Sequence, residues 1–200
     1  MADQRALDVV EYWLANNVGA DFLAVDGGTS TRQETRPERV DVGAQKFADL
    51  TAWVRERSPL AIWWAEFYPD VPESHEDEAG PESPASAVAT LAAVAAYAES
   101  EVSVALLWGP QAHSLEYAAL WTDSTRPEGG HPTPLTEAWQ WLVPRLADGE
   151  VEIGRSPNVP LLAFRADDGV VLVNLTGDPV QMEDGDEVPP WAILVTDRTD

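Results

Sequence analysis

Short apolar segments alternate with helical segments through the first 147 residues, and this alternation limits the possible folds more than any other feature. Three segments are nearly all apolar: residues 20–28 (ADFLAVDGG), 59–67 (PLAIWWAEF) and 102–110 (VSVALLWGP). Strands that are apolar along their whole length are typical of parallel sheets with both faces covered. The pattern therefore predicts an α/β fold with a parallel sheet and right-handed crossovers.

Four segments with apolar residues at helical spacing alternate with these strands, and they predict helices over residues 6–17, 42–57, 84–100 and 133–148. Ser83 is the expected N-cap of the third helix, with Pro84 in its first turn. Thr133 or Thr136 is the expected cap of the fourth. The loops that follow the strands are long, and they lie at the carboxyl end of the sheet, where α/β proteins place their sites.

The sequence changes character near residue 148. Short β-rich runs, such as VPLLAFRA and GVVLVNLT, are separated by the turn sequences DDG, TGDP and DGDEVPP. We therefore expect two parts, an α/β part over residues 1–147 and a small antiparallel, sandwich-like module over residues 148–200. A module of this size rarely has a sufficient core of its own, so it is expected to pack on the helices or to complete another sheet.

Charge and composition exclude several functions. The chain has 35 Asp and Glu residues against 12 Lys and Arg, a net charge of −23, which repels nucleic acids and anionic membranes. Acids spread along the chain are typical of a solvated, salt-tolerant, halophilic surface. The sequence has no cysteine, and His75, His113 and His131 lack zinc-binding spacing, so neither a metal nor another cofactor is expected. As written, the chain carries no export signal; the expected location is cytoplasmic, or extracellular if a signal precedes it.

Glu66 ends the second apolar segment within IWWAEF, and Trp108 ends the third within ALLWGP. These residues and the order of the elements resemble the C-terminal part of a retaining glycoside hydrolase of the TIM-barrel clan A, which includes β-xylosidases and cellulases. The resemblance implies a partial (β/α)8 TIM barrel, about strands six to eight, with an appended β-module. It also implies that Glu66 is the catalytic nucleophile and that Trp108 lines a sugar subsite.

The residue types agree with such a site. A carboxylate at the carboxyl end of a parallel strand points into the mouth of a barrel, where apolar surroundings can tune its pKa. Aromatic rings can stack on the apolar faces of sugars. Strict alternation along the strand places Trp64 on the face of Glu66 and Trp63 in the core. The candidate substrate-binding residues are Trp64, Phe67, Trp108, Asp26 and His113.

Each candidate also has a purely structural interpretation. Glu66 could be a solvated acid at a strand end, and Trp108 could belong to the core or to the contact between the two parts. Asp26 stands before two glycines, where its carboxylate could bond the loop backbone instead of a sugar. His113 could be an ordinary surface residue.

The second carboxyl group of a retaining glycosidase is missing. Retaining hydrolysis uses two carboxyl groups about 5 to 5.5 Å apart. The resemblance implies that the acid/base follows strand four in an "NE" pair, but the sequence has no such pair and no strand before residue 20. Three strands also cannot close an eight-stranded barrel.

We therefore expect a C-terminal fragment or subunit of a retaining glycosidase, inactive on its own. Its expected partners are a β-linked carbohydrate and a separate chain carrying the N-terminal half-barrel. A non-catalytic carbohydrate-binding or interaction protein remains an open alternative. A doubly wound nucleotide-binding domain is weaker, because no glycine-rich phosphate loop is present.

Overall fold

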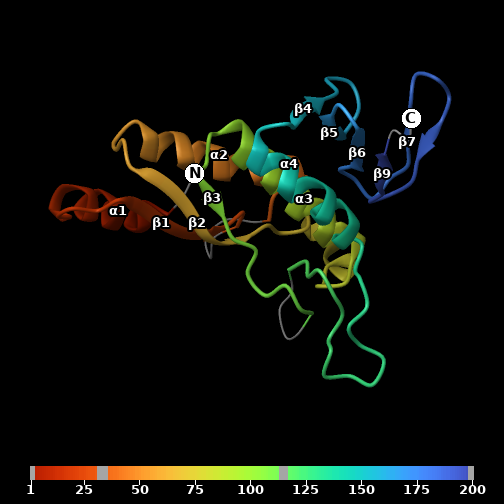
Figure 1. Ribbon diagram of the computed structural model, residues 1–200, viewed down its shortest axis with the longest axis horizontal. Coiled ribbons are helices and arrows are strands. Elements are labelled where there is room, and N and C mark those ends of the chain that lie inside the picture. The colour runs from red at the N-terminus through yellow and green to blue at the C-terminus, as the bar shows by residue number, and fades with distance from the viewer. Residues whose placement is uncertain (1–2, 31–35, 113–116, 198–200) are drawn as a thin grey trace.

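The computed structural model describes residues 3–30, 36–112 and 117–197 and has a mixed α/β fold (Figure 1). It contains a three-stranded parallel sheet, a four-stranded antiparallel sheet and a two-stranded antiparallel sheet. The prediction of a parallel sheet followed by antiparallel strands is confirmed. None of the helices within the described ranges is long and apolar enough to cross a membrane.

The parallel sheet comes from the first part of the chain, and its strands are neighbours in sequence order, β1-β2-β3. The strands are β1 (Phe22–Gly28), β2 (Ala61–Tyr68) and β3 (Val104–Ala105). One helix precedes each strand: α1 (Gln4–Asn16), α2 (Val40–Arg55) and α3 (Pro84–Glu99). A short 3-10 helix, η1 (Glu73–Glu78), separates β2 from α3, and α4 (Thr136–Asp148) follows β3 after a long loop.

The N-cap predicted for α3 is confirmed, whereas the N-cap predicted for α4 is not. The side chain of Ser83 accepts a hydrogen bond from the backbone N–H of Ser86 at 3.0 Å, as expected of an N-cap. The expected threonine cap of α4 is wrong, because Leu135 occupies the cap position and makes no side-chain bond there. The hydroxyl of Thr136, the first residue of α4, instead accepts a bond at 2.9 Å from the backbone N–H of Thr133 in the preceding loop.

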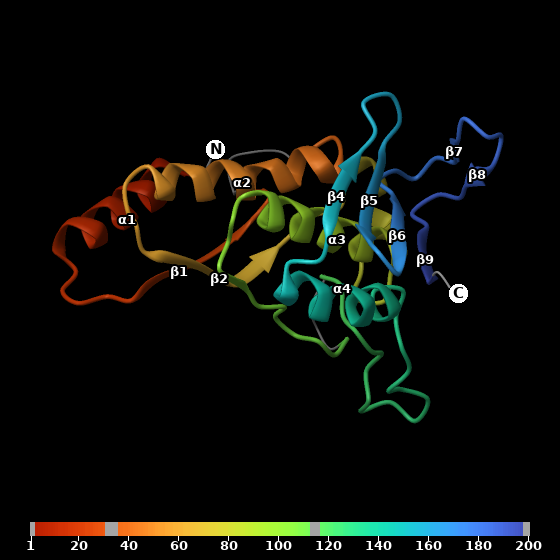
Figure 2. The same ribbon diagram turned by 45° about the horizontal axis from the view of Figure 1, so that its top comes forward.

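One face of the parallel sheet packs against helices. Leu23, Ile62 and Trp64 point toward α2 and α3, where they form a core with Phe47 and Tyr97. Figure 2 shows α2 and α3 along the same side of β1 and β2. The helix-facing side chains are therefore the buried half of each alternating strand.

The antiparallel sheet packs on the helices rather than standing alone. Its strands have the order β4-β5-β6-β9: β4 (Glu152–Arg155), β5 (Leu161–Ala166), β6 (Gly169–Asn174) and β9 (Ile193–Asp197). Phe164 and Val171 on its inner face share a core with α3 and with Trp141 on α4. The pair β7 (Val180–Gln181) and β8 (Glu187–Val188) contributes Val180 and Val188 to a small cluster with Leu161.

Helix α3 lies between these two cores. Ala93 and Tyr97 belong to the core under the parallel sheet, whereas Val88 and Leu91 belong to the core under the antiparallel sheet. Most other residues of the helix are alanines, and nearly all of them are buried. Small side chains let the helix approach neighbours on both sides, which explains its alanine-rich sequence.

Candidate functional site

A β-bulge in β2 decides which side chains lie at the carboxyl end of the parallel sheet. Val25 of β1 pairs with Trp64, but the next residue, Asp26, pairs with Glu66, so Ala65 is an extra residue in β2. Trp64 and Phe67 consequently belong to the same helix-facing core although they are three positions apart. Glu66 then lies on the opposite face of the sheet, away from the helices.

The expected positions of the two tryptophans are reversed. Trp64 is 1% exposed, and its indole N–H donates a hydrogen bond to the hydroxyl of Thr51 on α2 at 3.1 Å. Trp63, expected in the core, is half-buried on the face away from the helices and stacks on Phe22 with ring centroids 4.2 Å apart. The bulge is the physical reason, because it interrupts the alternation between Trp64 and Glu66. Trp64 is therefore not a sugar-stacking residue.

Phe67 is also a core residue. It is 3% exposed, and its ring lies edge-on to Phe47 and Tyr97 with centroid distances of 6.4 and 5.3 Å. A ring enclosed in this way has no free face to offer a sugar. The structure therefore places Phe67 in the helix-facing core, on the face opposite its neighbour Glu66, and gives no support to the expected substrate-binding role.

Glu66 is half-buried and hydrogen-bonded to Tyr68, two residues later on the same face. The Tyr68 hydroxyl donates to Oε2 of Glu66, and this bond is the main cause that raises the pKa of Tyr68 to about 12. Burial and the charges of Glu66 and Asp26 add to the shift. The ring of Tyr117 lies 4.9 Å from that of Tyr68. The phenol stays protonated at neutral pH and fixes the orientation of the carboxylate.

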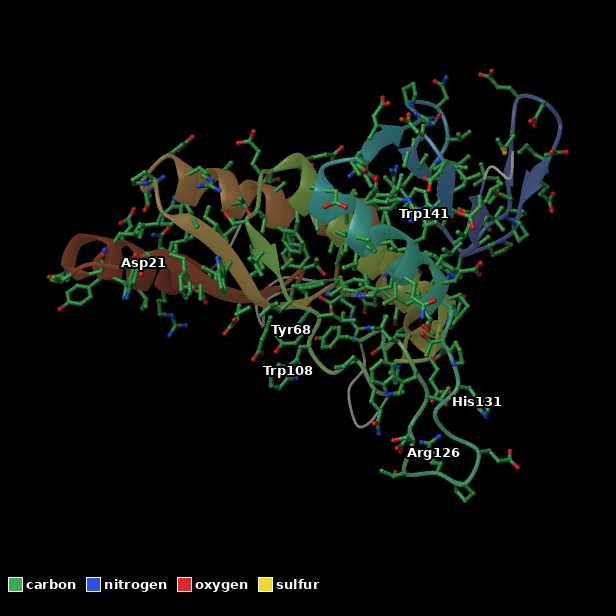
Figure 3. All side chains as sticks on the ribbon, viewed as in Figure 1. Asp21, Tyr68, Trp108, Arg126, His131 and Trp141 are labelled. Atoms are coloured by element: carbon green, nitrogen blue, oxygen red, sulfur yellow. The ribbon has the colours of Figure 1, made fainter. Side chains whose placement is uncertain are left out.

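Asp26 and Trp108 lie in the same part of the molecule. Asp26 is exposed and pairs in register with Glu66, so two carboxylates end neighbouring strands on one face. Strand β3 is shorter than expected, and Trp108 lies in the loop after it, 53% exposed. Figure 3 shows Trp108 and Tyr68 together at the same side of the molecule. His113 lies outside the described residues.

Within the described residues, no helix packs on the face of the sheet that carries Glu66, and this largely apolar face is called the uncovered face. Phe22, Leu106 and Trp108 are 41%, 48% and 53% exposed. Trp63 lies on β2, the central strand, which pairs with β1 on one side and with β3 on the other. Parallel sheets usually have both faces covered, and exposed apolar patches mark interaction surfaces. Sequence reasoning missed this face, because apolar residues in a strand do not reveal what covers them.

No protein-family model matches this chain, and no curated protein matches it either. Within the described ranges, no three His, Asp or Glu side chains gather closely enough to hold a metal ion. The chemistry that can be argued for the site therefore depends on Glu66, Tyr68, Asp26 and Trp108.

Proposed function

We propose that this chain carries the nucleophile of a retaining β-glycosidase and that Glu66 is that residue. One observation carries the proposal: Glu66 stands at the carboxyl end of a parallel strand, on an uncovered face, with its carboxylate held by the Tyr68 phenol. This position is where β/α proteins concentrate their catalytic residues. The exposed indole of Trp108 in the loop of the next strand supplies an apolar surface of the kind that sugars stack on.

The order of the strands supports a barrel over a doubly wound sheet. Strands β1, β2 and β3 are neighbours in sequence order, as in a (β/α)8 barrel, whereas a doubly wound sheet reverses its order at a switch point. We assign the three strands to positions six, seven and eight of such a barrel. The uncovered face that bears Glu66 is then the interior of the barrel, and the remaining strands supply the acid/base.

In this mechanism the carboxylate of Glu66 attacks the anomeric carbon, forming a carbon–oxygen bond as the bond to the leaving group breaks. The acid/base protonates the leaving oxygen and then removes a proton from the water that hydrolyses the glycosyl-enzyme. Tyr68 keeps its proton throughout, since its pKa is about 12, and it orients the nucleophile through Oε2. Asp26 accepts hydrogen bonds from sugar hydroxyls beside Glu66.

The test is a single polypeptide that joins this chain to strands one to five of a retaining β-xylosidase barrel. We expect hydrolysis of 4-nitrophenyl β-xyloside or β-glucoside, with retention of configuration. Glu66→Gln should reduce kcat/KM by at least ~10³-fold, because the nucleophile is lost. Azide should restore turnover of Glu66→Ala and yield the α-glycosyl azide.

Glu137→Gln, on the exposed surface of α4, is the matched control and should leave kcat/KM unchanged. Activity of Glu66→Gln close to that of the parent fusion would sink the assignment.

A second candidate, a non-catalytic carbohydrate-binding or interaction protein, is favoured by the exposed aromatic face alone. It predicts that Glu66→Gln and the parent chain bind β-linked xylo-oligosaccharides equally well and that the fusion hydrolyses none of them. Isothermal titration calorimetry of both chains separates this candidate from the glycosidase.

A further inference from the structure

Two apolar grooves lie at the two edges of the parallel sheet. The first, of about 380 Å³, lies along β1 between α1 and α2 and is lined by Ala6, Leu7, Val10, Val25 and Leu50 among others. The second, of about 460 Å³, lies along β3 between α3 and α4 and is lined by Tyr97, Val104, Trp139, Leu142 and Val143 among others. Each groove therefore has an edge strand as one wall and helices as the others.

Both edge strands have one neighbour only within the described residues. β1 pairs with β2 on one side, and β3 pairs with β2 on one side. The outer backbone N–H and C=O groups of an edge strand are a ready template for another strand. A strand added there would place every second side chain into the adjacent groove and the others onto the uncovered face that bears Phe22 and Leu106.

The two grooves and the uncovered face adjoin the same two edges of the sheet, the grooves on the helix side and the face on the other side. The face runs from Phe22 on β1, across Trp63 on β2, to Leu106 just after β3, and a groove begins beyond each edge. One partner that reaches both edges would bury this whole surface. Helices alone could cover the face, but they would leave the edge backbone groups unpaired.

A second copy of the chain fits this surface poorly. Two copies would bring two net charges of −23 together, which opposes association except at high salt. Joining β3 of one copy to β1 of the next gives six parallel strands from two copies and nine from three, so neither reaches the eight of a closed β/α barrel.

We propose that the two grooves and the uncovered face together dock a separate β/α polypeptide whose terminal strands add in parallel to β1 and to β3. This inference rests on the proposed function, because the docked polypeptide would also bring the missing acid/base to Glu66. The partner is defined by its architecture: five parallel strands with helices on their outer side and apolar residues on their inner side.

The probe is strands one to five of a retaining β-xylosidase barrel, expressed as a separate chain and mixed with this one in 1 M KCl. Sedimentation velocity should report a 1:1 complex. Hydrogen exchange of backbone amides should slow at least ~10-fold in residues 22–28 and 102–107. Residues 62–64 of the central strand, already paired on both sides, serve as the internal reference.

Matched variants locate the contact. Ala6→Glu and Val143→Glu each put a charge into one groove, and both positions are exposed enough for the chain to fold. Each should weaken binding of the probe at least ~10-fold, because a buried unpaired charge is costly. Val9→Glu on α1 and Val42→Glu on α2 lie outside the grooves, are 68% and 50% exposed, and should change the Kd less than ~2-fold.

Three results would overturn the docking proposal: no complex with the probe, equal binding by groove and control variants, or a self-associated dimer whose β1 and β3 amides are protected. The last result would identify a second copy as the occupant. Failure of the proposed function looks different. A 1:1 complex with protected edges that hydrolyses no aryl β-glycoside leaves the docking intact, and an active single-chain fusion without binding between separate chains leaves Glu66 intact.

Discussion

The hydroxyl of Tyr68 donates a hydrogen bond to the carboxylate of Glu66. The two side chains can meet because they are two residues apart on the same face of β2. Replacing Glu66 with Gln removes the charge that holds the phenolic proton, so the pKa of Tyr68 should fall from about 12 toward its ordinary value of 10.0. Absorbance at 295 nm during an alkaline titration measures this, with Tyr68→Phe to assign the transition and Glu137→Gln as control.

The same bond gives a stability that depends on pH. The pKa of Tyr68 is raised in the folded chain, so its contribution is fully present below pH 10 and is lost as the pH rises toward about 12. The urea midpoint of the parent chain should therefore fall between pH 10 and 12 more steeply than that of Tyr68→Phe. Identical slopes for the two chains would mean that the phenol is not linked to folding.

The hydrogen bond between Trp64 and Thr51 fixes the helix-facing side of β2. Thr51→Val keeps the shape of the side chain but leaves the buried indole N–H without its acceptor, which should cost about 1–3 kcal/mol. Thr90→Val is the control, because the Thr90 hydroxyl donates to the carbonyl of Ser86 and should cost less than about 1 kcal/mol. Urea denaturation measures both, and equal losses would contradict the buried position of Trp64.

Two phenylalanines test which faces are packed. Phe164 on β5 is fully buried against the helices, and Phe164→Ala should cost about 3–5 kcal/mol of unfolding free energy. Phe22 is 41% exposed on the uncovered face, and Phe22→Ala should cost less than about 1 kcal/mol in the isolated chain. Differential scanning calorimetry compares the two. A large loss for Phe22→Ala would indicate that this face is already covered.

A three-residue cluster ties η1 to the segment before β9. The indole N–H of Trp191 donates to Oε2 of Glu78 at 2.5 Å, and His75 Nδ1 lies 2.9 Å from Oε1. The bond with His75 is the main cause that lowers the pKa of Glu78 below its ordinary value of 4.5. The stability it confers is present above pH 4.5 and is lost as the pH falls through the lowered pKa.

Glu78→Gln should therefore show a smaller drop in the urea midpoint between pH 6 and pH 3 than the parent chain does. Glu73→Gln, exposed on the same short helix, is the control and should behave like the parent. An unchanged pH response in Glu78→Gln would show that the cluster does not contribute to acid stability.

Much of the fold could be predicted from periodicity, because apolar strands and amphipathic helices leave separate patterns in the sequence. The segments that became α2, β2 and α3 are examples, and the Ser83 cap was readable from local chemistry. Glu66 at a strand end was also readable. What covers a strand is a tertiary property, so neither the uncovered face around Phe22 nor the grooves at the sheet edges could be seen in advance.

The site residues were harder to predict than the elements that carry them. Trp64 was assigned by assuming an unbroken two-residue period, and one extra residue was enough to turn it to the helix side, whereas Phe67 was chosen as an aromatic ring beside Glu66 although neighbouring strand residues face opposite sides. A bulge has no reliable sequence signal when the extra residue is an alanine. Alternation places Tyr68 on the face of Glu66, but only the observed geometry shows that the phenol donates a hydrogen bond to the carboxylate.

The extra residue, Ala65, divides β2 into two stretches, each with its own alternation of side chains between the two faces of the sheet. On each side of it one residue packs on the helices while its neighbour faces away, Trp64 and Trp63 before it and Phe67 and Glu66 after it. Loss of this single alanine would make Trp64 and Glu66 consecutive and restore the regular period, with Glu66 still away from the helices and Phe67 still toward them. Pairing Ala65 as a regular ladder residue would instead turn Glu66 toward the helices and Phe67 outward, so the bulge lets β2 hold one more residue without burying the acid near its end.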